Sequence, residues 1–169
     1  DCALTGTHLG CEHGVCGACN VTLDGQSVRS CLMLAVQADG SKVDTVESLT
    51  QSGVIADLQS EFVARNALQC GYCTSGILAT AAEMLRGPQL SREGIRDVLS
   101  GNFCRCTGYH AIVDAIEDLP GGDDLVHRPR AFGVEGHELD EPEADALGAP
   151  VRGEVDDLVL IAAVWVDWA

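Results

Sequence analysis

Eight of the nine cysteines in this 169-residue chain fall into two groups of four. The first group reads C-x4-C-x2-C with a fourth cysteine further on, and the second reads C-x2-C followed later by C-x-C. The first spacing is that of a plant-type [2Fe–2S] centre, which four cysteine thiolates hold. The first group is Cys11, Cys16, Cys19 and Cys31, and the second is Cys70, Cys73, Cys104 and Cys106. We therefore expect the chain to fold around two one-electron centres.

Composition narrows the class of protein further. An odd number of cysteines with short C-x2-C spacings fits metal binding better than disulfide bridges, and it indicates a reducing compartment such as the cytoplasm. The formal net charge of −16 would repel phosphate backbones, which excludes nucleic acid as a partner. No apolar run reaches the ~18 residues that a membrane-spanning helix requires. We expect no membrane span.

The residues around the first group predict how its four thiols meet. Gly10, Gly14 and Gly17 interrupt the loop that carries three of the cysteines, and glycine permits the backbone to turn its amides toward sulfur. Asp24-Gly25 is a type I′ turn signal between two short β-type segments. In that hairpin Leu23 faces Gln26, and the register brings Cys31 back beside Cys19.

The second group is predicted to meet through a helical hairpin. Apolar spacing predicts a helix over about 74–86, which Gly87-Pro88 ends. Ser91 is expected to cap a second helix that runs to about residue 100, and a third helix is expected through Ile112 and Ile116. Because the first two helices are similar in length, an antiparallel arrangement returns the last two cysteines toward the first two.

Three segments differ in character along the chain. Residues 1–47 are rich in glycine and cysteine with β-type patterning, and residues 48–119 have helical patterning. Residues 120–169 open with Pro120-Gly121-Gly122 and contain twelve of the 26 acidic residues but only three of the ten basic ones. We expect this last segment to be an acidic, Gly- and Pro-rich tail whose role the sequence does not define.

Three motifs, read in order, resemble a known family. They are Gly10-Cys11-Glu12-His13-Gly14-Val15-Cys16-Gly17-Ala18-Cys19, Gln69-Cys70-Gly71-Tyr72-Cys73 and Cys104-Arg105-Cys106-Thr107-Gly108-Tyr109. Together they resemble the iron–sulfur small subunit of molybdenum hydroxylases, the family of xanthine dehydrogenase, aldehyde oxidoreductase and aerobic carbon monoxide dehydrogenase. The resemblance extends over about residues 4–119.

The resemblance implies an α+β fold. It implies a β-grasp, ferredoxin-like [2Fe–2S] domain over residues 1–47, followed by a four-helix [2Fe–2S]-binding domain over residues 48–119. The family has a β-hairpin before the segment that matches Leu4, and this sequence starts almost at that segment, with Asp1. We therefore expect the first domain to be incomplete at its N-terminus, with an open sheet edge.

The resemblance also implies a function, an electron-transfer subunit of an oxidoreductase that is not catalytic alone. Electrons would pass from molybdopterin cytosine dinucleotide on a large subunit, through the second and then the first cysteine group, to FAD on a medium subunit. Gln69 and Cys106 match positions that touch the pterin. The substrate and the external electron acceptor are not encoded in this subunit.

Two other interpretations remain open at the level of sequence. Tetrathiolate zinc sites also use C-x2-C spacings, so the second group taken alone is compatible with structural zinc. A free-standing ferredoxin-like carrier would likewise use two [2Fe–2S] clusters. Cys2 belongs to neither group, and we expect it to be a bystander.

Overall fold

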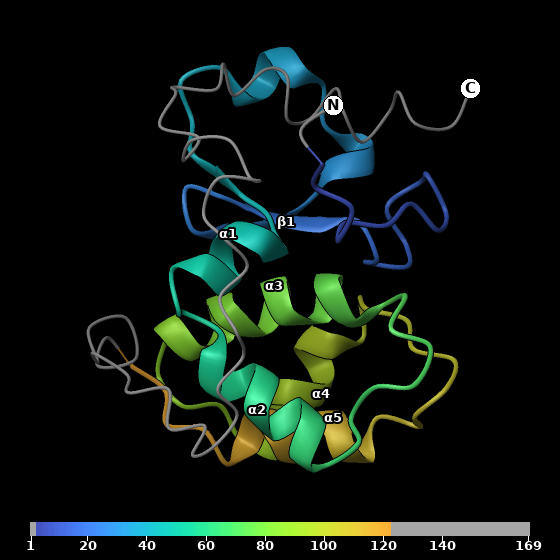
Figure 1. The fold of residues 1–169 in the computed structure, drawn as a ribbon, viewed down its shortest axis with the longest axis vertical. Helices are drawn as coiled ribbons and strands as arrows, with labels where there is room; N and C mark the ends of the chain where they lie inside the picture. Colours follow the sequence, from blue (N-terminus) through green and yellow to red (C-terminus); the bar gives the residue numbers. More distant parts are fainter. Residues whose placement is uncertain (1–2, 123–169) are drawn as a thin grey trace, which may run out of the picture.

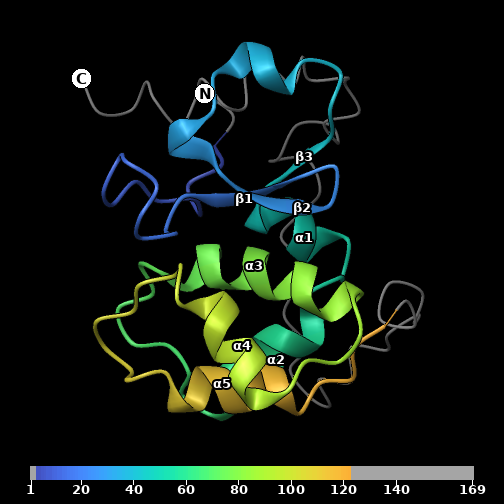
Figure 2. The same cartoon turned by 180° about the vertical axis from the view of Figure 1, so that it is seen from behind.

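The computed structural model describes residues 3–122 and arranges them in layers around one central helix. A small sheet and the loops around it lie on one side of helix α3 (Thr74–Arg86), and the other helices lie mostly on the opposite side (Figure 1, Figure 2). The predictions for Cys2 and for the acidic tail beyond Gly122 concern residues outside the described range.

Three short strands form the sheet. Strands β1 (Asn20–Leu23), β2 (Gln26–Arg29) and β3 (Val43–Asp44) are antiparallel in the order β2-β1-β3. Leu23 pairs with Gln26, so the predicted hairpin register is confirmed. Asp24 and Gly25 between them have φ values of 50° and 85°, as a type I′ turn requires.

The predicted helical segments are confirmed, α3 at the predicted bounds and α4 within one residue of its predicted end. Helix α3 ends at Arg86 before Gly87, and α4 begins after Ser91, whose hydroxyl accepts a hydrogen bond from the Gly94 amide at 3.2 Å. The remaining helices precede α3 or follow it in the chain. They are α1 (Val46–Gln51), α2 (Ala56–Ala64), α4 (Arg92–Leu99) and α5 (His110–Glu117), with 3-10 turns at Ser30–Leu32 and Ala35–Ala38.

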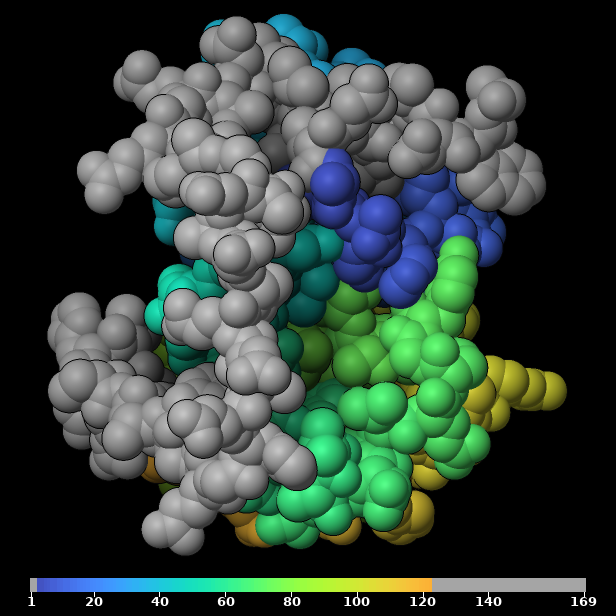
Figure 3. All heavy atoms as spheres, in the orientation of Figure 1, coloured from blue at the N-terminus to red at the C-terminus, as the bar shows by residue number. Residues whose placement is uncertain are grey.

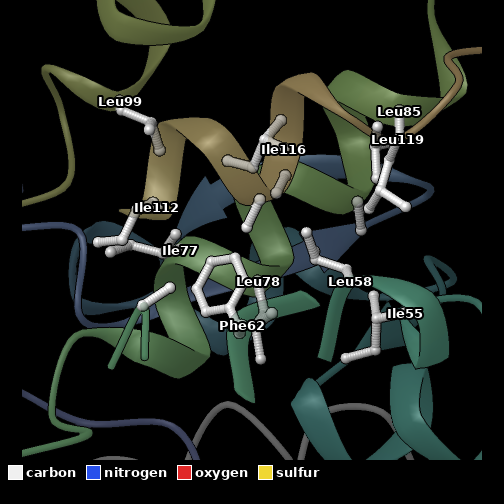
Figure 4. Close-up of a cluster of buried hydrophobic side chains, with 14 of the residues drawn as sticks. Ile55, Leu58, Phe62, Ile77, Leu78, Leu85, Leu99, Ile112, Ile116 and Leu119 are labelled. Carbon is white, nitrogen blue, oxygen red and sulfur yellow. The ribbon is translucent and has the colours of Figure 1, made fainter. Parts of the chain in front are cut away.

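Side chains from all five helices fill one hydrophobic core between α3 and the helices packed against it (Figure 4). Phe62 from α2 and Ile77 from α3 are 1% and 0% exposed, and Ile112 from α5 is 1% exposed. Each apolar side chain of this size contributes about 1.5–3 kcal/mol by leaving water. This core holds the helix ends, and therefore the cysteine-bearing loops, in place.

Helix α3 also fastens the hairpin. Glu83 accepts a hydrogen bond from the Ser27 amide at 2.8 Å. Strand β2 is at the edge of the sheet, so this bond satisfies an N–H that has no partner strand. Arg86 donates to the Gly25 carbonyl at 2.7 Å. These contacts leave the sheet, small as it is, anchored to the helical core rather than standing alone.

The coarse fold prediction, a small mixed α/β structure with a sheet and helices, is confirmed. Within residues 3–122, no helix has both the length and the apolar character needed to cross a membrane.

Candidate metal centres

The first cysteine group is built on a tight loop and the hairpin behind it. The amides of Val15 and Cys16 point at the Cys11 sulfur, at 3.3 and 3.4 Å. Gly17 has a φ of +72°, a conformation that favours glycine. A Cβ added at Gly10 would lie 3.0 Å from the Cys16 sulfur, so the backbone passes close to a thiol there.

The fourth member, Cys31, follows the hairpin as predicted but not as part of a strand. The β1–β2 ladder ends at the Asn20–Arg29 pair, and Cys31 lies in the 3-10 turn Ser30–Leu32. Ser30 continues the connection, because its amide and its hydroxyl both donate to the Cys19 carbonyl. Cys19 and Cys31 are 1% and 5% exposed, and their thiols face each other.

The four thiols of this group interact with one another. Hydrogen bonds from backbone amides lower the pKa of Cys11 from 9.0 to about 6, and the amide of His13 makes the largest contribution. Burial raises the pKa of Cys31 to about 11, and the neighbouring Cys19 and Cys11 thiols add to the effect. Burial also raises the pKa of Cys16, and the neighbouring Cys11 and Cys19 thiols raise it further. The structure therefore brings all four side chains into one electrostatic group.

The second cysteine group forms where two loops meet at helix N-termini. Cys70 and Cys73 precede α3, and Cys104 and Cys106 precede α5. The sulfurs of Cys70 and Cys106 are 3.5 Å apart at the surface. Free amides and the helix dipole at each N-terminus favour negative charge, by about 0.3–1 kcal/mol per helix end.

The inner side of this group is the pair Cys73 and Cys104. Burial raises the pKa of Cys73 to about 12, and the facing Cys104 thiol reinforces the effect. Burial works to raise the pKa of Cys104 as well, but hydrogen bonds to Thr107 outweigh it and the net pKa is lowered. The Thr107 hydroxyl lies 3.1 Å from the Cys104 sulfur.

Tyr109 braces this second loop. Its hydroxyl accepts a hydrogen bond from the Cys104 amide at 2.7 Å and donates one to the Asn102 carbonyl at 2.9 Å. Tyr109 itself sits just before α5 with a φ of 69°, and its amide donates to the Thr107 hydroxyl. Tyr109 therefore fixes the backbone of the loop that contains Cys104 and Cys106.

The two cysteine groups lie on the same side of the molecule. In both ribbon views the loop near residues 10–18 and the loops near residues 70 and 105 project from one side (Figure 1, Figure 2). The green atoms around residue 70 lie against the blue atoms of the first loop in the space-filling view (Figure 3). The Tyr72 hydroxyl donates a hydrogen bond to the Leu9 carbonyl. The Tyr72 ring also stacks on the His8 ring, with 4.6 Å between the two ring centroids.

A cavity of about 200 Å³ lies between the groups. Its lining includes one thiol from the first group and three from the second, together with the Tyr72 ring, the exposed Phe103 side chain and Arg105. The thiols in the lining are those of Cys16, Cys70, Cys73 and Cys106.

The donor set fits iron–sulfur clusters. Each group contains four free thiols. Side-chain interactions that shift the thiol pKa values join Cys11 with Cys16, Cys19 with Cys31, Cys70 with Cys106, and Cys73 with Cys104. Among residues 3–122, no three Cys, His, Asp or Glu side chains are arranged to hold a single metal ion. A [2Fe–2S] core differs from a single ion in dividing its four thiolates between separate iron atoms.

Gln69 and Cys106, the residues expected to touch a pterin, both lie at the surface. Gln69 is exposed in the loop after α2, and Cys106 is exposed beside the sulfur of Cys70. They belong to the same end of the molecule. Their role toward a pterin stays a prediction.

Sequence reasoning missed the polar residues that join the two loops. Arg29 donates to the Gly14 and Gly101 carbonyls, at 3.1 and 2.6 Å, and so bridges both cysteine loops. Asn102 is 1% exposed and lies in hydrogen-bond contact with both Gly17 and Thr80. No local pattern marks these residues, because their partners are distant in sequence.

Gly76 is another residue that sequence reasoning passed over. It lies in the first turn of α3, and a Cβ added there would lie 2.0 Å from the Gly17 carbonyl oxygen. Helix α3 therefore passes directly beneath the first loop. An isolated glycine inside a helical pattern is the one signal that indicates such a contact in advance.

Comparison with known proteins gives matches over this same part of the chain. Residues 7–64 match the family described as 2Fe-2S iron-sulfur cluster binding domain, and residues 45–117 match the family described as [2Fe-2S] binding domain.

Relatives are similar over most of their own length. The chain is 53% identical over 122 residues to the nicotine 6-hydroxylase small subunit of Paenarthrobacter nicotinovorans, covering 72% of this chain and 73% of that protein. It is 41% identical over 118 residues to the xanthine dehydrogenase iron-sulfur-binding subunit of Escherichia coli O157:H7, covering 68% and 74%. The solved structure of quinoline 2-oxidoreductase from Pseudomonas putida 86 is similar with a TM-score of 0.62 and 49% identity, covering 73% and 74%.

Proposed function

Because the chain belongs to the family of small iron–sulfur subunits of molybdenum hydroxylases, we propose that it relays electrons between two partner subunits. The electrons come from molybdopterin cytosine dinucleotide on a large subunit and pass to FAD on a medium subunit. Each [2Fe–2S] cluster, when bound, supplies a site that is reduced and reoxidised by one electron. No residue of this chain is assigned a catalytic role, and the hydroxylation belongs to the large subunit.

The observation that carries the proposal is the gathering of eight thiols into two groups on one side of the molecule. We propose that each interacting thiol pair would hold one iron atom when a cluster is bound. In the first cluster these are Cys11 with Cys16 and Cys19 with Cys31, and in the second they are Cys70 with Cys106 and Cys73 with Cys104.

Exposure supports the order of the relay. Cys70 and Cys106 are exposed together with Gln69, so a partner subunit can approach the second group directly. We propose that the pterin of the large subunit meets this surface at Gln69 and Cys106. The first group then faces the flavin subunit, with half-buried Cys11 and Cys16 nearest to the surface.

The relatives have names that point to different substrates, nicotine and xanthine among them. A shared relay subunit is compatible with all of these chemistries because it transfers only electrons. We infer that substrate selection belongs to the large subunit. Since the relatives are subunits of complexes, they favour this assignment over a free-standing ferredoxin-like carrier.

The finer description of the fold is part of the same proposal. We propose that the three-stranded sheet is part of a β-grasp domain over residues 1–47 and that residues 48–119 form a four-helix cluster-binding domain. The two matched families, which meet in residues 45–64, support a boundary in this region. We also propose a cytoplasmic location, because that compartment keeps thiols reduced and free to bind iron.

The first test is the cofactor content. The purified complex should contain iron and acid-labile sulfide, and reduction should give two distinguishable [2Fe–2S] paramagnetic signals. Bound zinc without sulfide, in a colourless protein, would establish the zinc-structured alternative instead. Co-purification with a large molybdenum-binding chain separates the subunit from a carrier, which would be isolated alone.

The second test is the variant Cys104→Ser. Loss of a thiolate should remove the second cluster signal and stop electron flow from molybdenum to flavin, while the first cluster signal stays. Cys2→Ser is the matched control, because Cys2 belongs to neither group, and it should retain both signals. Unimpaired electron flow in Cys104→Ser would refute the assignment of the second group.

A further inference from the structure

One backbone hydrogen bond connects the two cysteine groups. The Phe103 amide donates to the carbonyl of Cys16 at 2.8 Å. Cys16 belongs to the first group, and Phe103 is bonded directly to Cys104 of the second. The path from one thiol to the other therefore crosses a single hydrogen bond, and every other link in it is covalent.

The side chain of Asn102 fixes the position of the neighbouring Phe103 amide, which is the donor of this hydrogen bond. Asn102 is 1% exposed, and its amide nitrogen lies 3.4 Å from the Gly17 carbonyl, next to Cys16. Its side-chain oxygen accepts a hydrogen bond from Thr80 of α3 at 3.3 Å. Its backbone amide donates to Leu99 at 2.8 Å, so both the side chain and the peptide beside Phe103 are fixed.

Arg29 holds the same junction from the sheet. Its guanidinium donates to Gly14 in the first loop and to Gly101 in the second. A third bond, at 2.5 Å, goes to the side chain of Asn20, which in turn donates to Thr80 at 2.7 Å. The planar, rigid fork of arginine suits three acceptors in fixed directions, and lysine cannot reproduce it.

The backbones of the two loops touch at Gly17 and Gly101. A Cβ added at Gly17 would lie 2.6 Å from the Gly101 carbonyl oxygen, so the two backbones are in contact. Asn20 and Thr80 are 2% and 6% exposed, which makes this a buried polar network between the two groups. Buried networks of this kind rigidify the structure when their members are satisfied.

We propose that Asn102 and Arg29 are positioning residues for electron transfer between the clusters, because they hold the Phe103–Cys16 hydrogen bond that couples the two sites. This inference rests on the proposed function, which supplies the two clusters. With both clusters bound, one electron would leave the second and enter the first, so the oxidation and the reduction balance. The hydrogen bond keeps its proton on the Phe103 nitrogen, and no covalent bond forms or breaks. A bonded path couples the two sites better than a gap through space, so loosening the junction slows the transfer.

The test uses the assembled complex with the variants Arg29→Lys and Asn102→Ala. Arg29→Lys keeps the positive charge and removes the planar guanidinium group that donates the three hydrogen bonds. The control is Arg86→Lys, in which another arginine loses its bond to a backbone carbonyl, that of Gly25 in the hairpin turn. The readouts are the iron and sulfide content, the two midpoint potentials, the magnetic splitting between the reduced clusters, and the redistribution of one electron after flash reduction by photoreduced deazaflavin.

We expect both variants to keep their iron, sulfide and potentials, with a several-fold slower redistribution and a weaker magnetic splitting, while Arg86→Lys matches the unmodified complex. Unchanged redistribution and splitting in Arg29→Lys would overturn the inference. Outright loss of a cluster in Arg29→Lys would also overturn it, because the residue would then be structural. If Asn102→Ala fails to assemble, Arg29→Lys alone decides. Absence of two [2Fe–2S] signals in the unmodified complex would refute the proposed function instead.

Discussion

At the scale of single residues, backbone amides and burial shift the pKa values of Cys11 and Cys31 in opposite directions. Cys11 accepts hydrogen bonds from neighbouring amides, whereas Cys31 lies among buried atoms. The spacing of the cysteines predicted which residues belong together. It did not predict this inequality, which depends on the direction of amides and on packing from other segments.

The unequal acidities predict unequal reactivity in the metal-free protein. At pH 7 the Cys11 thiol, with a pKa of about 6, is mostly thiolate, while Cys31, with a pKa of about 11, stays protonated. Because the thiolate is the nucleophile, iodoacetamide should label Cys11 about ten-fold faster or more. Peptide mass spectrometry over time measures the two rates. Equal labelling of both cysteines would contradict the prediction.

At the scale of elements, the local patterns predicted most of the secondary structure around the cysteines. The Asp24-Gly25 turn, the Ser91 cap and the end of α3 before Gly87 all lie where the sequence indicated. These signals are local, since each depends on the conformational preference of one or two residues. The close approach of α3 to the first loop depends on residues nearly sixty positions apart, and only the lone Gly76 indicates it in the sequence.

This close approach predicts the effect of Gly76→Ala. Alanine favours the helix by up to about 1 kcal/mol over glycine. Its Cβ would, however, lie 2.0 Å from the Gly17 carbonyl, and the overpacking should lower the free energy of unfolding by about 1–3 kcal/mol. Urea unfolding measures the change.

Gly94→Ala in α4 is the matched control for this substitution. A Cβ there would meet its nearest atom at 3.5 Å, an ordinary contact. Without a clash, only the helix preference remains, so this variant should be as stable as the unmodified protein or up to about 1 kcal/mol more stable. Equal stabilisation in Gly76→Ala would show that α3 does not pack closely beneath the first loop.

At the scale of the whole molecule, one helical core supports both cysteine groups. Helix α3 packs on the core with one face and on the sheet with another, so the hairpin and the helical loops share one support (Figure 1). A defect in the core should therefore affect both groups rather than the nearer one alone.

Phe62→Ala tests this shared support. Removing a buried phenylalanine ring should lower the free energy of unfolding by about 3–5 kcal/mol. Its neighbour Val63 is 70% exposed, and Val63→Ala should change the stability by less than about 0.5 kcal/mol. Thermal unfolding followed by circular dichroism measures stability, and visible absorption reports the clusters. Retention of one cluster's absorption through the Phe62→Ala transition would argue against a common core.

The division of eight cysteines into two groups and the short elements that flank them could be predicted from the sequence. Those features follow from spacing, turn chemistry and helical periodicity, which act over a few residues. The position of both groups on one side of the molecule, and the joining of their loops by Arg29 and Asn102, depend on the folded structure. A hydrogen bond between residues 72 or 85 positions apart forms only after the core has brought their backbones together. Patterns that act over a few residues cannot encode such a contact.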